Sequence, residues 1–273
     1  MRLSYATFTN AGSRLNNEDS LGFDVQSGAQ GDVPGGAQNR APDGVQVGTQ
    51  SGTITNAQTA FFAVADGLGG HNGGEMASSI AIAEALAAFR EMPEDLSTCF
   101  ERGQQSILRT QAQDSAASDM KTTLTLLRIS GARVQWGHIG DTRLYWFVSG
   151  HLRCHTLDHS VPQMLAALGE IREQDIRHHE DRNRLLKVMG IEWPEPRYEL
   201  ADEVALSGED SFLLATDGFW EYVDEKEMER ARRFAVSPEH WLKRMLRMAE
   251  KNARGHDRDN HTAIAVFMRG DQR

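Results

Sequence analysis

The sequence has no apolar run that reaches the roughly 20 residues of a membrane-spanning helix. Its N-terminal stretch, MRLSYATFTNAGSR, contains neither the apolar core of a signal peptide nor a cleavage site. Cysteine is scarce: Cys99 and Cys154 stand far apart and form no metal-ligand pair. We therefore expect a cytoplasmic protein whose two thiols are reduced.

Basic residues are outnumbered by acids. Lys and Arg together number 29 and Asp and Glu number 39, which gives a formal net charge of −10. A net negative surface argues against nucleic acid and against an anionic membrane as partners, because both are bound through clustered Lys and Arg. The same excess of acids is expected where carboxylates are gathered to hold cations.

The remaining composition is that of a globular protein. The chain has 273 residues, of which 40% are hydrophobic and 25% are charged, enough for one large domain or two small ones. Residues 26–58 differ, because they are rich in Gly, Gln, Ala and Pro and have almost no large apolar side chain. We interpret this stretch as an inserted loop with at most a weak hairpin.

Short apolar and alternating runs predict strands, which we place at 2–9, 59–65, 122–130, 132–139, 143–148, 151–156, 197–201, 211–216 and 262–268. Helical spacing predicts helices at 74–91, 94–117, 224–233 and 238–253. The first of these helices has a predicted apolar face made of Met76, Ile80, Ala83, Leu86 and Ala87. Residues 160–195 are polar, with short helical patches, and should lie over the surface. Strands in two groups with helices between them predict an α+β layered domain.

Carboxylates recur where predicted strands begin or end, and they are Glu18, Asp19, Asp66, Asp141, Asp217 and Asp259. Taken singly, each has a simpler interpretation, such as a turn or a solvated loop. Taken together, strand ends on one rim of a sandwich can converge, and carboxylates that converge repel one another unless cations neutralise them. Oxygen ligands without Cys or His select Mg²⁺ or Mn²⁺ over Zn²⁺.

Seven segments carry a family resemblance. In chain order they are Arg14-Leu-Asn-Asn-Glu18-Asp19, Ala65-Asp66-Gly67-Leu-Gly69-Gly70-His71-Asn-Gly-Gly74-Glu75-Met-Ala77-Ser78, Thr122-Thr123-Leu124, Gly140-Asp141-Thr142-Arg143, Leu157-Asp158-His159-Ser160, Ala215-Thr216-Asp217-Gly218 and Asp259-Asn260-His-Thr262. Each segment alone is a weak signal, but seven in order are specific. Over residues 3–268 the chain resembles the metal-dependent protein serine/threonine phosphatases of the PP2C (PPM) type, bacterial branch.

The resemblance implies a four-layer αββα sandwich, in which two antiparallel β-sheets are flanked by helices. It implies one phosphatase domain over residues 1–273. That domain would carry the insertion at about 26–58, where the family has a short hairpin, and a flap at about 160–195 beside the active site. It also implies two Mn²⁺ or Mg²⁺ ions per active site, with a third and weaker ion in bacterial members.

The resemblance also assigns roles by position. Asp66 would bridge both ions, the Gly67 carbonyl would bind the second ion, and Asp217 and Asp259 would complete the first. Glu18 and Asp19 would act through water, Asp141 would hold the third ion, and Arg14 would bind the substrate phosphate. We further expect Asn260 to orient Asp259 and His159 to orient the loop beside it. For His71 two interpretations stay open, a general acid and a hydrogen bond within its Gly-rich turn.

The implied function is hydrolysis of phosphoserine and phosphothreonine in proteins by a monomer, reversing a bacterial Ser/Thr kinase. Two ions roughly 3.5–4 Å apart activate a water for in-line attack, so no phosphoenzyme is needed. One alternative is an inactive binding module that regulates a kinase or a secretion component, although such a module should lack the carboxylates. Another is a switch that acts on one small phosphoprotein of a stress response, although such switches usually carry sensor domains. The run Asp217-Gly-Phe-Trp220-Glu221 resembles phosphatases that accompany kinases controlling type VI secretion.

Overall fold

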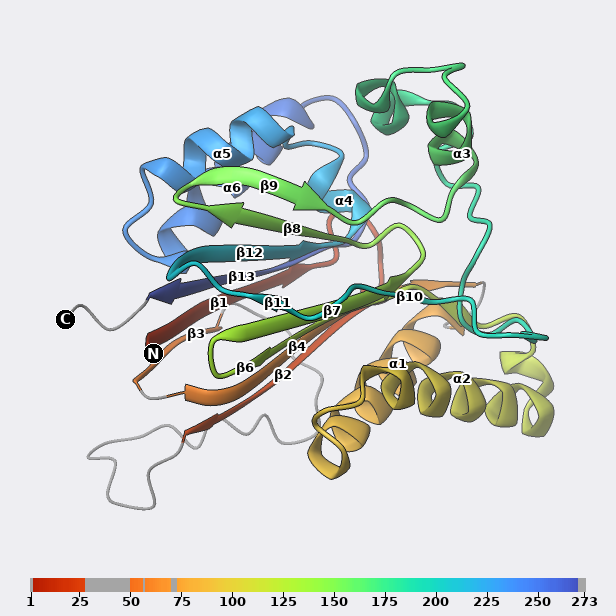
Figure 1. The fold of residues 1–273 in the computed structure, drawn as a ribbon. Helices are drawn as coiled ribbons and strands as arrows, with labels where there is room; N and C mark the ends of the chain where they lie inside the picture. Colours follow the sequence, from red (N-terminus) through yellow and green to blue (C-terminus); the bar gives the residue numbers. More distant parts are fainter. Residues whose placement is uncertain (1, 28–49, 56, 70–72, 270–273) are drawn as a thin grey trace.

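The structure is a computed structural model that describes residues 2–27, 50–55, 57–69 and 73–269. Two antiparallel sheets lie face to face in this part of the chain, with helices on both outer faces (Figure 1). The layers confirm the predicted αββα sandwich.

The first sheet runs in the order β3-β1-β13-β12-β8-β9. Its strands are β1 (Arg2–Asn10), β3 (Gln50–Thr55), β8 (Arg143–Val148), β9 (His151–His155), β12 (Glu209–Ala215) and β13 (His261–Arg269). The second sheet runs in the order β10-β7-β6-β4-β2, with β11 paired to β7 and β5 paired to β4. Its strands are β2 (Asp19–Ser27), β4 (Ala57–Leu68), β5 (Lys121–Thr122), β6 (Leu124–Ser130), β7 (Arg133–Ile139), β10 (Glu199–Leu200) and β11 (Val204–Ala205).

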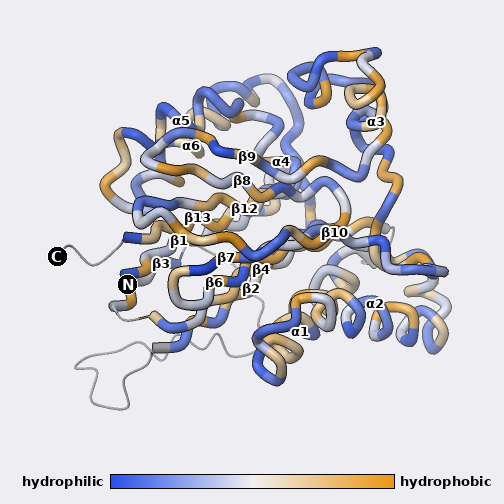
Figure 2. The backbone as a smooth tube through the Cα atoms, viewed as in Figure 1, coloured by the Kyte–Doolittle hydropathy of each residue, from blue (hydrophilic) through white to orange (hydrophobic). Residues whose placement is uncertain are grey.

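Helices cover the outer face of each sheet. Helices α1 (Gly73–Glu91) and α2 (Leu96–Gln113) pack on the second sheet, and α4 (Asp217–Trp220), α5 (Glu225–Arg233) and α6 (Pro238–Asn252) pack on the first. The segment between β9 and β10 carries α3 (Val161–Ala167) and the short 3-10 helix η2 (Glu173–His178). Hydrophobic and hydrophilic residues alternate along the helices in Figure 2, as expected where one helix face is buried.

Strand β4 lies between β6 and β2 in the second sheet, and both of its faces are buried. Phe62 and Val64 pack in the core between the sheets, whereas Phe61 and Ala63 pack against α1 and α2. Burial of both faces explains why the strand reads as a continuous apolar run instead of an alternating one. A fully buried Phe contributes about 1.5–3 kcal/mol, so β4 anchors both layers.

Some predicted boundaries are wrong. Strand β4 does not end at residue 65 but continues through Asp66 to Leu68, because Gly67 and Leu68 pair with β5. The helix predicted at 94–117 ends at Gln113, where the Asp114 side chain caps a separate 3-10 turn. Strand β2 was not predicted, although Leu21, Phe23 and Val25 alternate along it.

The predicted apolar face of α1 is also partly wrong. Met76 is 40% exposed and Ala83 is exposed, whereas Ala77, Ala81 and Ala85 are fully buried. Six of the nineteen residues of this helix are alanine, so the hydrophobic contrast between its faces is small and the spacing alone does not fix the buried side.

The predicted insertion at 26–58 is covered only in part, because residues 28–49 and 56 lie outside the described residues. Its first residues extend β2, and residues 50–55 form β3, which pairs with β1. Both cysteines are free thiols, and burial raises the pKa of Cys99 to about 12. Among the described helices, none combines the length and apolarity needed to cross a membrane.

Candidate active site

Five of the six predicted carboxylates line one cleft, and the sixth, Asp19, lies next to it on the strand that pairs with Asp66. A cavity of about 440 Å³ is lined by Glu18, Asp66, Asp141, Asp217 and Asp259, together with Arg14, Gly67 and Asn260. Strand pairing explains this convergence, since Asp66 near the end of β4 lies opposite Asp19 at the start of β2. In the other sheet, the end of β12 pairs with the start of β13, which brings the Asp217 and Asp259 segments together.

The backbone of Asp66 is fixed by two neighbouring threonines. The Asp66 N–H donates to the Thr123 hydroxyl at 2.9 Å. Its carbonyl accepts from the Thr123 N–H at 2.9 Å and from the Thr122 hydroxyl at 2.8 Å. Because both main-chain groups are bonded, the position of the Asp66 carboxylate depends on its own side-chain torsions alone.

Two glycines let three backbone segments meet at the cleft. A Cβ on Gly67 would lie 2.1 Å from the Gly74 carbonyl oxygen, and a Cβ on Gly74 would lie 2.9 Å from the Glu18 carboxyl. The Gly67 N–H donates to the Glu18 carbonyl at 3.2 Å. Only glycine fits such contacts, so the start of α1, the end of β4 and the Glu18 loop form one rigid corner of the site.

Asp217 and Asp259 are each held by the next main-chain N–H. Gly218 donates to Asp217 Oδ1 at 2.6 Å, and Asn260 donates to Asp259 Oδ1 at 2.8 Å. The other oxygen of Asp259 accepts from Arg14 Nη2 at 2.7 Å, at the exposed rim of the cleft. This bond raises the pKa of Arg14 above its ordinary value.

The Asn260 side chain holds the loop that carries Arg14 and Glu18. Its Oδ1 accepts from the Glu18 N–H at 2.7 Å, and its Nδ2 donates to the carbonyls of Ala11 and Asn16, both at 2.9 Å. The contact to Asp259 that we predicted is made by the main-chain N–H of Asn260 and not by its amide side chain.

Asp141 lies just after β7, and its carbonyl accepts from the Trp220 indole N–H at 3.0 Å. The Arg143 guanidinium stacks on the Trp220 ring at 3.7 Å. Arg143 in turn makes two bonds of 2.7 Å to the Asp158 carboxylate, and both side chains of this pair are buried. A buried ion pair therefore supports the ring that holds Asp141.

Burial, and then repulsion from neighbouring carboxylates, raises the pKa of Glu18, Asp19, Asp66, Asp141 and Asp217. Burial is the larger cause for Asp66 and Asp141, whose pKa values lie well above the ordinary range, and neighbouring carboxylates add to it. The pKa of Asp19 rises to about 7, chiefly through burial. Burial also raises the pKa of Asp217 and of Glu18, with the charge of Asp259 as the next cause in both.

The cluster fits a divalent cation. Its donors are all oxygens, and Asp19 Oδ1 is buried with no hydrogen-bond partner among the described residues. Without cations, these acids must take up protons or repel one another at neutral pH. A hard divalent cation would offset both penalties, which agrees with the residues predicted as ligands.

The sequence did not point to several residues of this region. Asn183 and Leu185, from the segment predicted as a flap, line the cleft. Glu221 bonds to Arg182 of the same segment at 2.7 Å, and burial followed by the charge of Asp217 raises the pKa of Glu221 to about 7. The signal for Arg182, Asn183 and Leu185 was their place in a long polar segment, which does not show which side chains turn inward, and Glu221 was noted only as part of a sequence run. His71 lies outside the described residues.

Comparison with known proteins places this cleft in context. The family model described as "Protein phosphatase 2C" matches residues 49–259. The serine/threonine phosphatase stp of Listeria monocytogenes is 31% identical over 176 residues, which covers 61% of this chain and 69% of stp.

Two solved structures resemble the whole chain. The serine/threonine phosphatase PstP of Mycobacterium tuberculosis is 24% identical with a TM-score of 0.73, over 99% of this chain and 100% of that chain. Another structure of the PstP catalytic domain contains two manganese ions. The Ser-Thr phosphatase MsPP of Mycobacterium smegmatis, in complex with cacodylate, is 26% identical with a TM-score of 0.69, over 97% of this chain and 98% of that chain.

Proposed function

The chain belongs to the protein phosphatase 2C family of serine/threonine phosphatases, and we propose that it hydrolyses phosphoserine and phosphothreonine in proteins with two divalent cations in the carboxylate cleft. The observation that carries this proposal is the meeting of five carboxylates in one cavity, where burial raises the pKa of Glu18, Asp66, Asp141 and Asp217. The two manganese ions in the related PstP domain support Mn²⁺ as the cation. A third ion at Asp141, and Mg²⁺ as an alternative, belong to the same proposal.

In this proposal Asp66 is the shared ligand. Burial is the largest cause of its raised pKa, and the charges of Asp19, Asp217, Asp141 and Asp259 add to it, so its carboxylate interacts with all four of these acids. Asp217 and Asp259, beside β12 and β13 of the first sheet, would hold the first cation, and the Gly67 carbonyl, from the second sheet, would hold the second. Glu18 and Asp19 would orient water. When bound, the cations supply charge for the phosphate and lower the pKa of water at the site.

Arg14 would bind the substrate phosphate. Its guanidinium is largely exposed at the rim, and the bond to Asp259 uses one of its two terminal nitrogens. The planar fork matches phosphate oxygens, whereas a lysine ammonium would offer a point charge. Because Asp259 is itself a proposed ligand, this bond aligns the phosphate-binding group with the cation site.

The substrates in this proposal are proteins phosphorylated by a Ser/Thr kinase. The names of the relatives support this class of substrate but do not identify a particular phosphoprotein. An inactive binding module gains no support, because the acids that such a module should lack are present and gathered. A role of His71 as general acid stays a prediction.

The test is Mn²⁺-dependent release of phosphate from a phosphothreonine peptide. We expect release with Mn²⁺, none with EDTA, and a loss on the order of a hundredfold or more in Asp66→Asn. Asp202→Asn, which changes an exposed acid outside the cleft, is the matched control and should keep wild-type turnover. Wild-type turnover in Asp66→Asn would refute the cation assignment.

Arg14 is tested separately. Arg14→Ala should raise KM for the peptide more than it weakens Mn²⁺ binding, and Arg14→Lys should recover only part of the loss. An unchanged KM in Arg14→Ala would remove its assigned role while leaving the cation site standing.

A further inference from the structure

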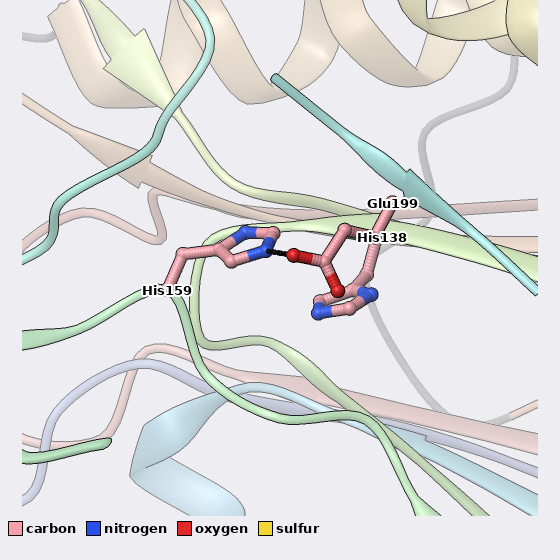
Figure 3. Close-up of side chains that lie close together, drawn as sticks. All are labelled: His138, His159 and Glu199. Atoms are coloured by element: carbon pink, nitrogen blue, oxygen red, sulfur yellow. Dashed lines mark hydrogen bonds and ion pairs between the residues drawn. The ribbon is translucent and has the colours of Figure 1, made fainter. Parts of the chain in front are cut away.

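A second cluster of ionisable side chains lies outside the cleft (Figure 3). It joins His138 of β7, His159 at the start of the 160–195 segment and Glu199 of β10. One potential ligand atom from each lies within 4.8 Å of the others. Both histidines are buried, and their rings stack at 4.6 Å. Such a trio is either a metal site or a chain of hydrogen bonds. The positions of the protons on the two imidazole rings distinguish between these.

The hydrogen bonds fix the proton on each ring. The Gly140 N–H donates to His159 Nδ1 at 3.1 Å, so this nitrogen carries the lone pair and the proton is on Nε2. That N–H donates to Glu199 Oε1 at 2.8 Å. His138 Nε2 lies 2.8 Å from the Leu157 carbonyl, which can only accept, so Nε2 of His138 is also protonated.

Both ring nitrogens of His159 are hydrogen-bonded without an ion. A protonated Nε2 of His159 offers no lone pair, and a metal could bind there only if the ring gave up its bond from Gly140 or became an anion. The Lys187 ammonium also donates to Glu199 Oε1, at 3.0 Å, and supplies the positive charge that faces this carboxylate. The contacts therefore favour a chain of hydrogen bonds over a metal centre.

The protonation states agree with the geometry. Burial lowers the pKa of His159 to about 4, with the neighbouring His138 as the second cause, so the ring is neutral at pH 7. Burial alone would raise the pKa of Glu199, but the bonds from His159 and Lys187 outweigh it and lower the pKa to about 2. A neutral imidazole thus donates to a fully ionised carboxylate.

The chain of hydrogen bonds from Glu199 through the His159 ring ends at Gly140, the residue before Asp141. His159 bonds to both main-chain groups of Gly140. Its ring accepts from the Gly140 N–H, and its main-chain N–H donates to the Gly140 carbonyl at 2.9 Å. Gly140 has a φ of +101°, a conformation that side chains rarely adopt. The Leu186 N–H donates to the His159 carbonyl at 2.7 Å, so the far end of the flap segment also meets His159.

We propose that His159 is a positioning residue for Asp141, held in the required tautomer by Glu199, and that it links the base of the flap segment to the third-ion site. This rests on the proposed function, in which Asp141 binds that ion. It goes further because it assigns the positioning of Asp141 to a side chain that would contact neither the ion nor the substrate. Outer partners of metal ligands typically change metal affinity about 10–100-fold when they are lost.

Two substitutions test the two ring nitrogens of His159 separately. In His159→Asn the amide oxygen stands near the position of Nδ1 and can still accept from Gly140. In His159→Gln the amide nitrogen stands near the position of Nε2 and can still donate to Glu199, but the Gly140 bond is lost. We expect the Gln variant to weaken the weakest class of Mn²⁺ sites about tenfold or more, and the Asn variant to stay close to wild type.

The measurement is a Mn²⁺ titration of the full chain, in which electron paramagnetic resonance detects the free ion. Thermal unfolding checks that each variant is folded. His151→Gln is the matched control, because His151 is an exposed histidine that also pairs with a glutamate, Glu229, and it should change nothing. If the Gln variant fails to fold, Glu199→Ala replaces it, since Glu199 is half-exposed. That variant should weaken the same class of sites to a smaller extent.

Equal weak-site affinity in wild type and His159→Gln, or equal losses in the Asn and Gln variants, would overturn the proposal. So would stoichiometric Zn²⁺ binding to wild type that disappears in His138→Ala, because the trio would then be a metal site. Absence of the tight Mn²⁺ sites in wild type would instead refute the proposed function.

Discussion

Replacing Asn260 should loosen the Arg14 loop and destabilise the protein. Its side chain is buried and makes three hydrogen bonds of 2.7–2.9 Å, to Glu18, Ala11 and Asn16. Each such bond contributes about 0.5–1.5 kcal/mol net, so Asn260→Ala should lower the free energy of unfolding by roughly 3 kcal/mol.

Asn260→Asp sharpens the test because it keeps the shape of the side chain. One carboxylate oxygen can still accept from the Glu18 N–H, but the other would face the carbonyls of Ala11 and Asn16, which also only accept. The new charge also stands beside Asp259 and Glu18. We therefore expect Asn260→Asp to be at least as destabilised as Asn260→Ala when no metal is present.

The assay is urea unfolding in EDTA, with peptide hydrolysis in Mn²⁺ as a second measurement. Gln105→Glu is the control, since it makes the same amide-to-carboxylate change at an exposed position of α2 and should change stability by no more than about 0.5 kcal/mol. Hydrolysis by Asn260→Ala should show a raised KM, because Arg14 lies on the loosened loop. Wild-type stability in Asn260→Asp would refute the reasoning, since the amide donors would then contribute nothing.

Two further predictions concern buried charge. Asp158→Ala removes the carboxylate that pairs with the buried Arg143 guanidinium and should lower the free energy of unfolding in urea by about 3–5 kcal/mol. The double variant Arg143→Met with Asp158→Leu should recover most of that loss. Equal losses in the single and the double variant would contradict this prediction. In EDTA, Asp19→Asn should be more stable than wild type at pH 7.5, with an advantage that shrinks as the pH falls towards 5. The reason is that folding raises the Asp19 pKa from its ordinary 3.8 to about 7, so the penalty to wild type is full above pH 7 and shrinks steadily as the pH falls from 7 towards 3.8. Thermal unfolding at the two pH values measures this, and a constant advantage would rule out Asp19 as the titrating group.

The sequence was sufficient for the layers and for the acids of the cleft. Asp66 and Asp217 follow buried apolar runs, and strand ends in an antiparallel sandwich must gather at its rims. Order along the chain therefore determined which acids could meet. Strand β2 was within reach as well, since the alternation of Leu21, Phe23 and Val25 was present but overlooked beside the unusual insertion.

The supporting contacts could not be predicted in the same way. Trp220 and Asp141 are 79 residues apart, and Glu199 is 40 residues from His159. No local period links such pairs, because their contact depends on how one layer packs on another. The sequence did single out His159 as a residue that orients its neighbouring loop, and the bonds to Gly140 agree with that expectation.

The most direct test of the two-cation site is the number of Mn²⁺ ions that each variant binds, measured by equilibrium dialysis. Wild type should bind two ions tightly. Asp66→Asn should lose both, because Asp66 is the shared ligand, and Asp259→Asn should lose one. Two tightly bound ions in Asp66→Asn would contradict the account.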